Sequence, residues 1–207
     1  MKLIVCSSEL STYLEESDPI NFQHPQILKK VKEFQGDSNS KFEWAEQAFH
    51  FVRDEIQHSF DKESTVITIS ASETFEKKEG ICFAKSHLLA AFLRAMEIPA
   101  GFCYQRVTRK GTPESGYALH GFNAVYFEEY GGWFRVDPRG NKPGISSEFS
   151  VNQEKLAYPI RQELGEIDYP YIFSKPLEEV VFSMRCSKDC NELFFNRPEA
   201  IHNKSTV

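Results

Sequence analysis

The 207-residue sequence has few cysteines and no long apolar run. Five cysteines are an odd number for a chain of this size, which argues against a disulfide framework. Cys186 and Cys190 form a C-x-x-x-C pair without a second pair, so we expect no zinc site and no other metal site. The longest apolar runs fall far short of the roughly 20 residues that a membrane-spanning helix needs.

Basic residues are also in the minority. Lysine and arginine total 24 against 30 aspartate and glutamate residues, which gives a net charge of −6. This balance argues against a nucleic acid or an anionic membrane as the main partner. The apolar run near Met1 ends before Glu9, whereas a secretory signal usually needs about 7–15 apolar residues. We therefore expect a cytoplasmic protein with neither a nucleic-acid nor a membrane partner.

Hydrophobic residues are abundant, at 41% of the chain with 18 phenylalanines, and this favours a folded globular protein. The length suits a single domain over residues 1–207. We find no internal repeat, no low-complexity tract and no second domain.

The first half of the chain predicts helices. Pro25 is expected to open a short helix, and residues 36–40 are expected to form a loop. Ser40 then has the character of an N-cap with Glu43 as its capping-box partner. The helix that follows has an apolar face at spacings of 3 and 4 residues, formed by Phe42, Ala45, Phe49, Val52 and Ile56. Residues 59–79 are polar and are expected to form a loop with one short ordered piece, and residues 83–96 predict a largely buried helix that ends before Pro99.

The second half predicts an antiparallel meander. Residues 102–107, 119–127 and 133–136 are typical of strands, and short turn-rich connections separate them. Residues 138–175 hold many turn formers, the apolar run 177–184 fits either a strand or a short helix, and the polar end from Pro198 is expected to fray. These elements together indicate an α+β fold.

Three residues in this pattern have the chemistry of a thiol site. Cys82 begins the buried helix, where the helix dipole favours a thiolate and an unpaired backbone N–H can donate to an oxyanion. His120 lies in the second strand, and Asp137 follows the third strand across the Gly131-Gly132 turn. A hairpin at that turn brings the carboxylate toward the imidazole, which it can orient.

Structural roles compete with this interpretation, because a lone cysteine in a buried helix or a lone histidine in a strand is more often a packing residue. Two glycines favour a reactive site. Gly80 is expected to leave room beside the sulfur for a substrate, and Gly121 is expected to leave access to the His120 ring.

The sequence resembles the transglutaminase-like superfamily, whose core is a papain-related thiol fold. The resemblance covers roughly residues 40–140, which leaves residues 1–39 and 141–207 as flanking extensions. It rests on the segments Gly80-Ile81-Cys82, Leu93-Arg94-Ala95, Ile98-Pro99-Ala100, His120 and Trp133-Phe134-Arg135-Val136-Asp137-Pro138. It implies a central helix with an N-terminal cysteine packed on an antiparallel sheet. It also implies Cys82 as nucleophile, His120 as base and acid, and Asp137 as orienting residue.

Two positions depart from the family pattern. Phe122 and Asn123 stand where a small residue and tryptophan often follow the histidine, and Glu97 replaces the glycine commonly found before Ile-Pro. The superfamily includes crosslinking enzymes, peptidases, other amide hydrolases and inactive members, so the resemblance does not select a reaction.

The leading hypothesis is a cysteine enzyme that cleaves or transfers an acyl group from a peptide, protein or small amide, with hydrolysis slightly favoured over crosslinking. No cofactor is required for this chemistry. The alternatives are a silent binding or scaffold protein with the same fold and an acyltransferase that uses a small thioester.

Five further residues are candidates for the rest of the site. Gln57 or His58, at the end of the preceding helix, is a candidate second oxyanion donor. The aromatic side chains of Phe83, Tyr104 and Trp133 are candidates for an acyl groove, although aromatics at such positions more often belong to the core.

Overall fold

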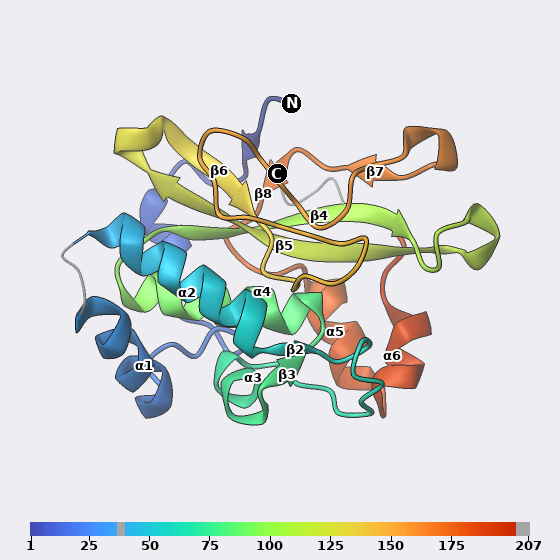
Figure 1. Ribbon diagram of the computed structural model, residues 1–207, viewed down its shortest axis with the longest axis horizontal. Coiled ribbons are helices and arrows are strands. Elements are labelled where there is room, and N and C mark those ends of the chain that lie inside the picture. The colour runs from blue at the N-terminus through green and yellow to red at the C-terminus, as the bar shows by residue number, and fades with distance from the viewer. Residues whose placement is uncertain (37–39, 202–207) are drawn as a thin grey trace.

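The computed structural model describes residues 1–36 and 40–201. Its main sheet packs on a layer of helices (Figure 1). The helices and strands follow one another along the chain as β1 (Ile4–Val5), α1 (Pro25–Gly36), α2 (Lys41–Glu55), β2 (Gln57–His58), α3 (Ala71–Lys77), β3 (Glu79–Gly80), α4 (Cys82–Ala95), β4 (Ala100–Thr108), β5 (Tyr117–Phe127), β6 (Gly132–Val136), β7 (Ile167–Asp168), β8 (Tyr171–Ile172), α5 (Glu178–Cys186) and α6 (Cys190–Asn196).

The main sheet has the strand order β6-β5-β4-β7, and every neighbouring pair is antiparallel. The meander predicted for β4, β5 and β6 is confirmed, and so is the α+β class. The short strand β7 extends the sheet at the outer edge of β4, which the turn-rich sequence of residues 138–175 did not predict. Two small parallel pairs, β1 with β8 and β2 with β3, complete the strand pairing of the described residues.

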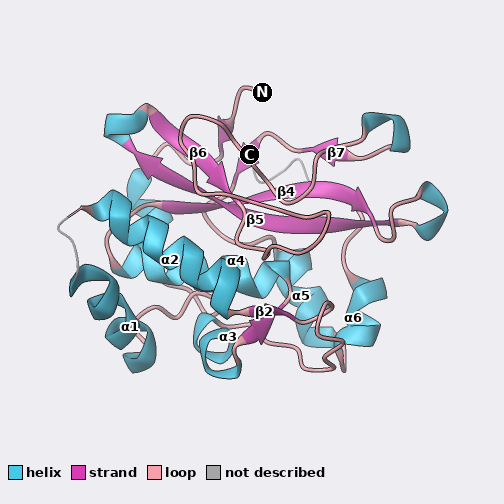
Figure 2. Ribbon diagram, in the orientation of Figure 1, coloured by secondary structure: helices cyan, strands magenta, loops and turns pink. Residues whose placement is uncertain are grey.

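Helix α4 is the centre of the molecule, between the sheet and the layer of α1, α2 and α3 (Figures 1 and 2). Every residue of α4 except Ala95 is buried. Apolar side chains therefore surround this helix on all sides, and this explains its weak amphipathic pattern. Its few polar side chains are held inside the protein, so the N-terminus of α4 lies in a buried setting.

Two capping serines mark the starts of α2 and α3. The Ser40 side chain accepts a hydrogen bond from the Glu43 N–H at 3.4 Å, as predicted. The predicted loop is wrong for residues 71–77, which form α3. Ser70 and Glu73 make a full capping box at its start, and the Ser-x-x-Glu spacing was readable in the sequence.

The C-terminal third also differs from expectation. The ambiguous apolar run 177–184 is mostly helical, in α5, and α6 was not predicted. The chain after α6 does not fray at once, because the Leu119 N–H donates to the Pro198 carbonyl at 2.7 Å. The remainder of the predicted frayed end, residues 202–207, and residues 37–39 of the predicted loop lie outside the described residues.

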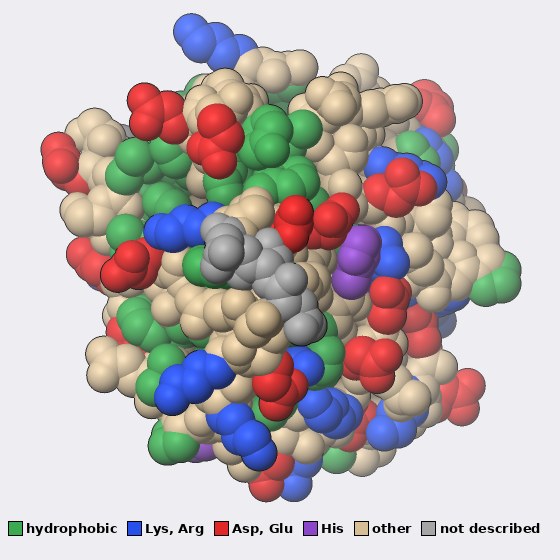
Figure 3. All heavy atoms as spheres, turned by 60° about the vertical axis from the view of Figure 1, so that its left-hand side comes forward, with side chains coloured by type: hydrophobic (Ala, Val, Ile, Leu, Met, Phe, Trp, Pro, Cys, Tyr) green, Lys and Arg blue, Asp and Glu red, His purple; other side chains and the backbone are tan. Residues whose placement is uncertain are grey.

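The surface carries charges of both signs. Acidic and basic side chains are interspersed over the face shown in Figure 3. No helix within residues 1–36 and 40–201 has the length and apolar character needed to cross a membrane.

Candidate active site

Cys82 is the first residue of α4, and only the N-cap Ile81 separates it from β3. The β2–β3 pair places Gln57 and His58 beside this point, because His58 is in register with Gly80. The N-cap Ile81 offers no side-chain hydrogen bond, so the first backbone N–H groups of α4 have no cap. Cys82 is only 3% exposed.

His120 and Asp137 meet across two antiparallel strands. Asn123 on β5 pairs with Val136 on β6, and Asp137 follows as the chain leaves the sheet. His120 Nε2 lies 2.7 Å from Asp137 Oδ2. The other ring nitrogen, Nδ1, is left for the Cys82 thiol, whose pKa His120 lowers. The structure therefore brings the three side chains together in the order Cys82, His120, Asp137.

The Asp137 carboxylate is fully buried and held by the backbone as well as by His120. Its Oδ1 accepts the Arg139 N–H at 3.1 Å, and its Oδ2 accepts the Ala157 N–H at 3.0 Å. Ser147 donates its hydroxyl to the Asp137 carbonyl oxygen at 2.6 Å. These bonds fix the carboxylate and favour its ionised form.

The three groups shift one another's pKa values toward an ion pair. Burial alone would raise the pKa of the Cys82 thiol, but the hydrogen bond and charge of His120 lower it below its ordinary value. Burial opposes the charge on His120, yet Asp137 and Cys82 raise the pKa of the ring to about 9. Burial likewise opposes the charge on Asp137, and His120 with the backbone N–H groups holds its pKa low. These shifts favour a thiolate beside an imidazolium over the neutral pair.

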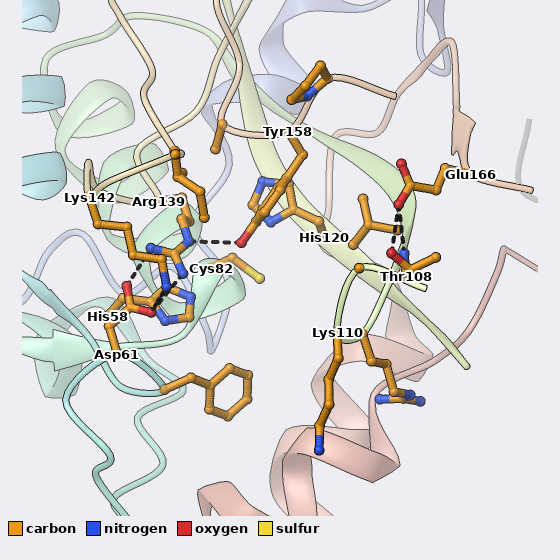
Figure 4. A pocket seen from close by; sticks show the side chains of 18 of the residues that line it. His58, Asp61, Cys82, Thr108, Lys110, His120, Arg139, Lys142, Tyr158 and Glu166 are labelled. Carbon is orange, nitrogen blue, oxygen red and sulfur yellow. Dashed lines mark hydrogen bonds and ion pairs between the residues drawn. The ribbon is translucent and has the colours of Figure 1, made fainter. Parts of the chain in front are cut away.

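Tyr158 covers the outer side of His120. The two rings meet edge to face, with centroids 4.8 Å apart and planes at 81°. Its hydroxyl oxygen accepts a hydrogen bond from Arg139 Nε at 3.0 Å. Figure 4 shows Cys82, His120 and Tyr158 converging on one point.

A cavity of about 610 Å³ opens at this point. Its inner end is formed by Cys82, His120, His58 and Tyr158 (Figure 4). The walls come from the loop after β2, the end of β4, the loop 139–145, the segment 157–166 and the end of α6. A volume of this size accommodates a small molecule or a short stretch of peptide.

The two candidate oxyanion donors are separated by the structure. His58 is 8% exposed and lines the cavity with Cys82, whereas Gln57 is exposed and is absent from the lining. Burial and the charge of Arg139 hold the pKa of His58 well below its ordinary value, so its ring is neutral and carries one N–H. Within the described residues, His58 Nδ1 has no hydrogen-bond partner.

The three candidate groove aromatics pack elsewhere, which corrects the sequence-based expectation. Phe83 is fully buried beneath β5, and the hydroxyl of the buried Tyr104 accepts the Leu177 N–H at 3.0 Å. Trp133 packs against Tyr13, with ring centroids 4.7 Å apart. The aromatic side chains that do line the cavity are Phe60, Tyr158 and Phe194.

The two glycines make room for protein atoms, not for a substrate. A Cβ on Gly80 would lie 2.8 Å from the Ala84 Cβ, and one on Gly121 would lie 2.6 Å from the Phe83 ring. Both glycines therefore allow close packing against α4, and the expected openings beside the sulfur and the imidazole are wrong.

Several cavity residues come from the C-terminal third, where the sequence has no periodic pattern. Ala157, Tyr158 and Arg197 are examples, and no local signal marks them. Arg135 and Arg139 both pair with carboxylates. Arg135 holds Glu154 and Asp168, and Arg139 holds Asp61. In the part of the chain that is described, no group of three or more His, Cys, Asp or Glu side chains is placed to hold a metal ion.

The sequence profile of the transglutaminase-like superfamily matches residues 29–138, more than half of the chain. The protein belongs to the transglutaminase-like superfamily. The match includes Cys82, His120 and Asp137. No curated protein has a sequence that matches this one.

The fold of the chain is also similar to that of solved structures. A candidate cysteine protease from Cytophaga hutchinsonii superposes with a TM-score of 0.51 at 18% identity, over 64% of this chain and 43% of the other. The periplasmic domain of TgpA from Pseudomonas aeruginosa gives a TM-score of 0.46 at 20% identity, over 64% of this chain and 48% of the other. The alignments thus span less than half of either solved chain. The first likeness supports the fold, which is that of the transglutaminase-like and papain-like proteins.

Proposed function

We propose that this protein is a cysteine enzyme that cleaves an acyl group from an amide through an acyl-enzyme at Cys82. The observation that carries the proposal is the buried set of Cys82, His120 and Asp137 at the inner end of a cavity, in which His120 lowers the pKa of the thiol and pairs with the carboxylate at 2.7 Å. A thiolate held against an imidazolium is the reactive form of such a site.

The reaction is written in two steps. The Cys82 thiolate attacks the amide carbonyl, a C–S bond forms, and the C–N bond breaks as His120 gives its proton to the departing amine. Water then attacks the thioester, His120 takes a proton from it, and the C–S bond breaks to release the acid and the thiolate. Asp137 holds one ring orientation and stabilises the imidazolium throughout.

The oxyanion formed in each step lies next to the start of α4. We assign the backbone N–H of Cys82 as one donor, because the first N–H groups of a helix have no partner within it. We assign His58 as the second donor, because its ring lines the cavity beside Cys82 and is neutral. Gln57 is exposed outside that lining and has no part in this proposal.

Water is favoured over an amine as the acyl acceptor. The cavity lining has six lysine and arginine side chains and two carboxylates. A lysine side chain entering as acceptor carries a positive charge before it reacts, and that charge is repelled here. This observation supports hydrolysis over protein crosslinking.

The test is the reactivity of Cys82 compared with the other four thiols. We expect iodoacetamide at pH 6 to alkylate Cys82 faster than the exposed Cys186, with both sites followed by peptide mass spectrometry. Trapping an acyl-enzyme from cell extract, with Cys82→Ala as control, then identifies the acyl group. If Cys82 reacts no faster than Cys186 at any pH from 6 to 8, the catalytic assignment fails and the silent scaffold is the better description.

A further inference from the structure

The cavity beside Cys82 is cationic in a protein with a net charge of −6. The positively charged lining residues come from four different walls, and the two acidic ones are Asp61 and Glu166. The cationic residues are Arg109, Lys110, Arg139, Lys142, Arg161 and Arg197. The formal surplus of four positive charges is opposite in sign to the protein as a whole.

Both carboxylates are already engaged. Asp61 accepts two hydrogen bonds from Arg139, at 2.5 and 2.9 Å, and one from Lys142 at 2.5 Å. Glu166 accepts a hydrogen bond from Arg161 at 2.6 Å. The remaining cations of the lining therefore have no cavity carboxylate to neutralise them.

Arg109 is committed to the protein backbone. Its guanidinium donates to the carbonyl oxygens of Phe194, Phe195 and Arg197, at the end of α6. Its nearest carboxylate oxygen, on the exposed Glu199, is 3.8 Å away. These bonds fix the main chain that carries Arg197 and hold that side chain at the cavity wall.

Arg197 is the cation with donors to spare. Its guanidinium lies 4.9 Å from the ring centroids of both Phe60 and Phe194. Within residues 1–36 and 40–201 it has no ion pair, and its one hydrogen bond is a long contact of 3.4 Å from Nε to the Phe194 carbonyl. Two aromatic faces orient the group, while its terminal nitrogens have no protein acceptor in the described ranges.

The guanidinium of Arg197 acts electrostatically on the reactive thiol. Its charge contributes to the lowered pKa of Cys82. Burial and the neighbouring Arg109 reduce the pKa of Arg197 itself to about 10, with Cys82 opposing that shift. Arg197 is therefore still charged at neutral pH, close enough to the sulfur to influence a bound reactant. Lys110, which is exposed, lines the cavity on the side away from Asp61 (Figure 4).

We propose that the substrate of this cavity carries an anionic group, a carboxylate or a phosphate, which Arg197 binds beside Cys82 with Lys110 assisting at the rim. This inference rests on the proposed function, because it names the substrate class of the same thiol site. Arg197 is then a specificity-determining residue. Its structural alternative is an anchor that only packs α6 against Phe60.

The test compares two alkylating reagents of nearly equal size, iodoacetate and iodoacetamide, which differ in charge. The rate ratio of iodoacetate to iodoacetamide at Cys82 is divided by the same ratio at Cys186 in the same sample, which removes the intrinsic difference between the reagents. His120 also attracts anions when protonated, so the decisive quantity is the change in this ratio on substitution. We expect Arg197→Gln to lower it about fivefold or more, and Lys110→Gln to lower it less.

Two further variants separate charge from packing. Arg197→Lys keeps the charge and should retain most of the preference for iodoacetate. If Arg197 only packs, the rate ratio should be the same in Arg197→Lys and Arg197→Gln. Lys29→Gln removes one positive charge from an exposed site on α1 and should leave the ratio unchanged. An unchanged ratio in Arg197→Gln, with Cys82 still highly reactive toward iodoacetamide, overturns the anion site alone. If Cys82 of the unmodified protein reacts no faster than Cys186, the proposed function itself is overturned.

Protection of Cys82 from alkylation by added anions shows whether the anionic group of the substrate is a carboxylate or a phosphate. Succinate and inorganic phosphate are each tested for slowing of the iodoacetamide reaction at Cys82, with ionic strength held constant by NaCl. Protection by succinate indicates a carboxylate substrate, and protection by phosphate indicates a phosphorylated one. In both cases the protection should weaken in Arg197→Gln, and protection that persists unchanged in that variant contradicts the assignment.

Discussion

At the scale of single residues, the site depends on how each ionisable group is paired. Asp137 is fully buried and accepts hydrogen bonds from His120 and from two backbone N–H groups. A carboxylate with this many donors stays ionised and keeps His120 protonated well above its usual range. Asp137 therefore controls the charge of His120, and through it the pKa of Cys82, without contacting the sulfur.

Replacement of Asp137 tests this control. We expect Asp137→Asn to lower the rate of Cys82 alkylation by iodoacetamide at pH 7 by about tenfold or more, since each pKa unit lost by His120 changes its protonated fraction up to tenfold. The upper limb of the pH–rate profile, set by His120 near pH 9 in the unmodified protein, should move to lower pH. Asp18→Asn, at an exposed carboxylate, is the control. An upper limb that stays in place would show that Asp137 has no role in holding the proton.

Lys85 is a second buried cation close to the site. Its ammonium donates to the carbonyl oxygens of Arg53 and Ile56, at the end of α2. Burial, together with the charge of Arg139, lowers its pKa to about 7 from 10.5. Between these values the unfolded chain binds a proton that the folded chain lacks, so this group makes stability rise with pH.

Lys85→Met should remove that rise. The difference in unfolding free energy between the unmodified protein and the variant should grow in favour of the unmodified protein by about 2 kcal/mol from pH 7 to pH 9. Urea denaturation at the two pH values measures it. The titrations of Cys82 and His120 are common to both proteins and cancel in the difference. Lys29→Met, at an exposed lysine, is the control. Parallel pH profiles for the Lys85 variant and the unmodified protein would contradict the prediction.

At the scale of elements, the site depends on how closely β5 approaches α4. Gly121, next to His120, faces the Phe83 ring at a distance that leaves no space for a side chain. The same strand carries His120, and the same helix carries Cys82. The distance between the two reactive groups is therefore set by this packing.

Gly121→Ala should push β5 and α4 apart. We expect it to lower the unfolding free energy by about 1–3 kcal/mol, as overpacking does, and to slow Cys82 alkylation at pH 7 because the thiol and the imidazole move apart. Gly36→Ala is the matched control, since a Cβ there has nothing within 4 Å among the described residues and alanine favours a helix over glycine. Equal stability of Gly121→Ala and the unmodified protein would mean that the contact relaxes without consequence.

Elements with a local signal were predictable from the sequence, and elements fixed by distant partners were not. Patterns among neighbouring residues predict the apolar face of α2, the cap at Ser40 and the strands around Gly131. The strand β7 has two residues and takes its place by pairing with β4, while Asp168 is bound by Arg135 from β6. Cys82, His120 and Asp137 could be proposed because they begin, lie within or follow such local elements. Tyr158 and Arg197 reach the cavity through contacts that span the chain, which no local pattern encodes.

At the scale of the whole molecule, one buried arginine joins segments from both ends of the chain. Arg94, in α4, donates to the carbonyl oxygens of Glu15 at 2.6 Å, Ala100 at 2.7 Å and Ser174 at 2.6 Å. It is 3% exposed. The N-terminal segment and the segment before α5 are thereby tied to the central helix.

Arg94→Met should leave three carbonyl groups without their donor. We expect a loss of about 3 kcal/mol or more in unfolding free energy, measured by urea denaturation, because each buried unpaired polar group costs about 1–3 kcal/mol. The comparison is Arg185→Met, whose exposed pair with Asp18 should be worth less than about 1 kcal/mol. Similar losses in the two variants would refute the assignment of Arg94 as a structural tie.

The groups that surround the site come from two regions of the chain with different relations to the family. Cys82, His120 and Asp137 lie within the matched residues 29–138, whereas Tyr158, Phe194 and Arg197, which shape the cavity, lie after them. In evolutionary terms, the proposed function assigns the reaction to the matched residues and the choice of substrate to the last third of the chain. Under this proposal, relatives that share Cys82, His120 and Asp137 can differ in substrate. Replacing residues 139–201 with those of a relative should then transfer the substrate preference of that relative to this protein.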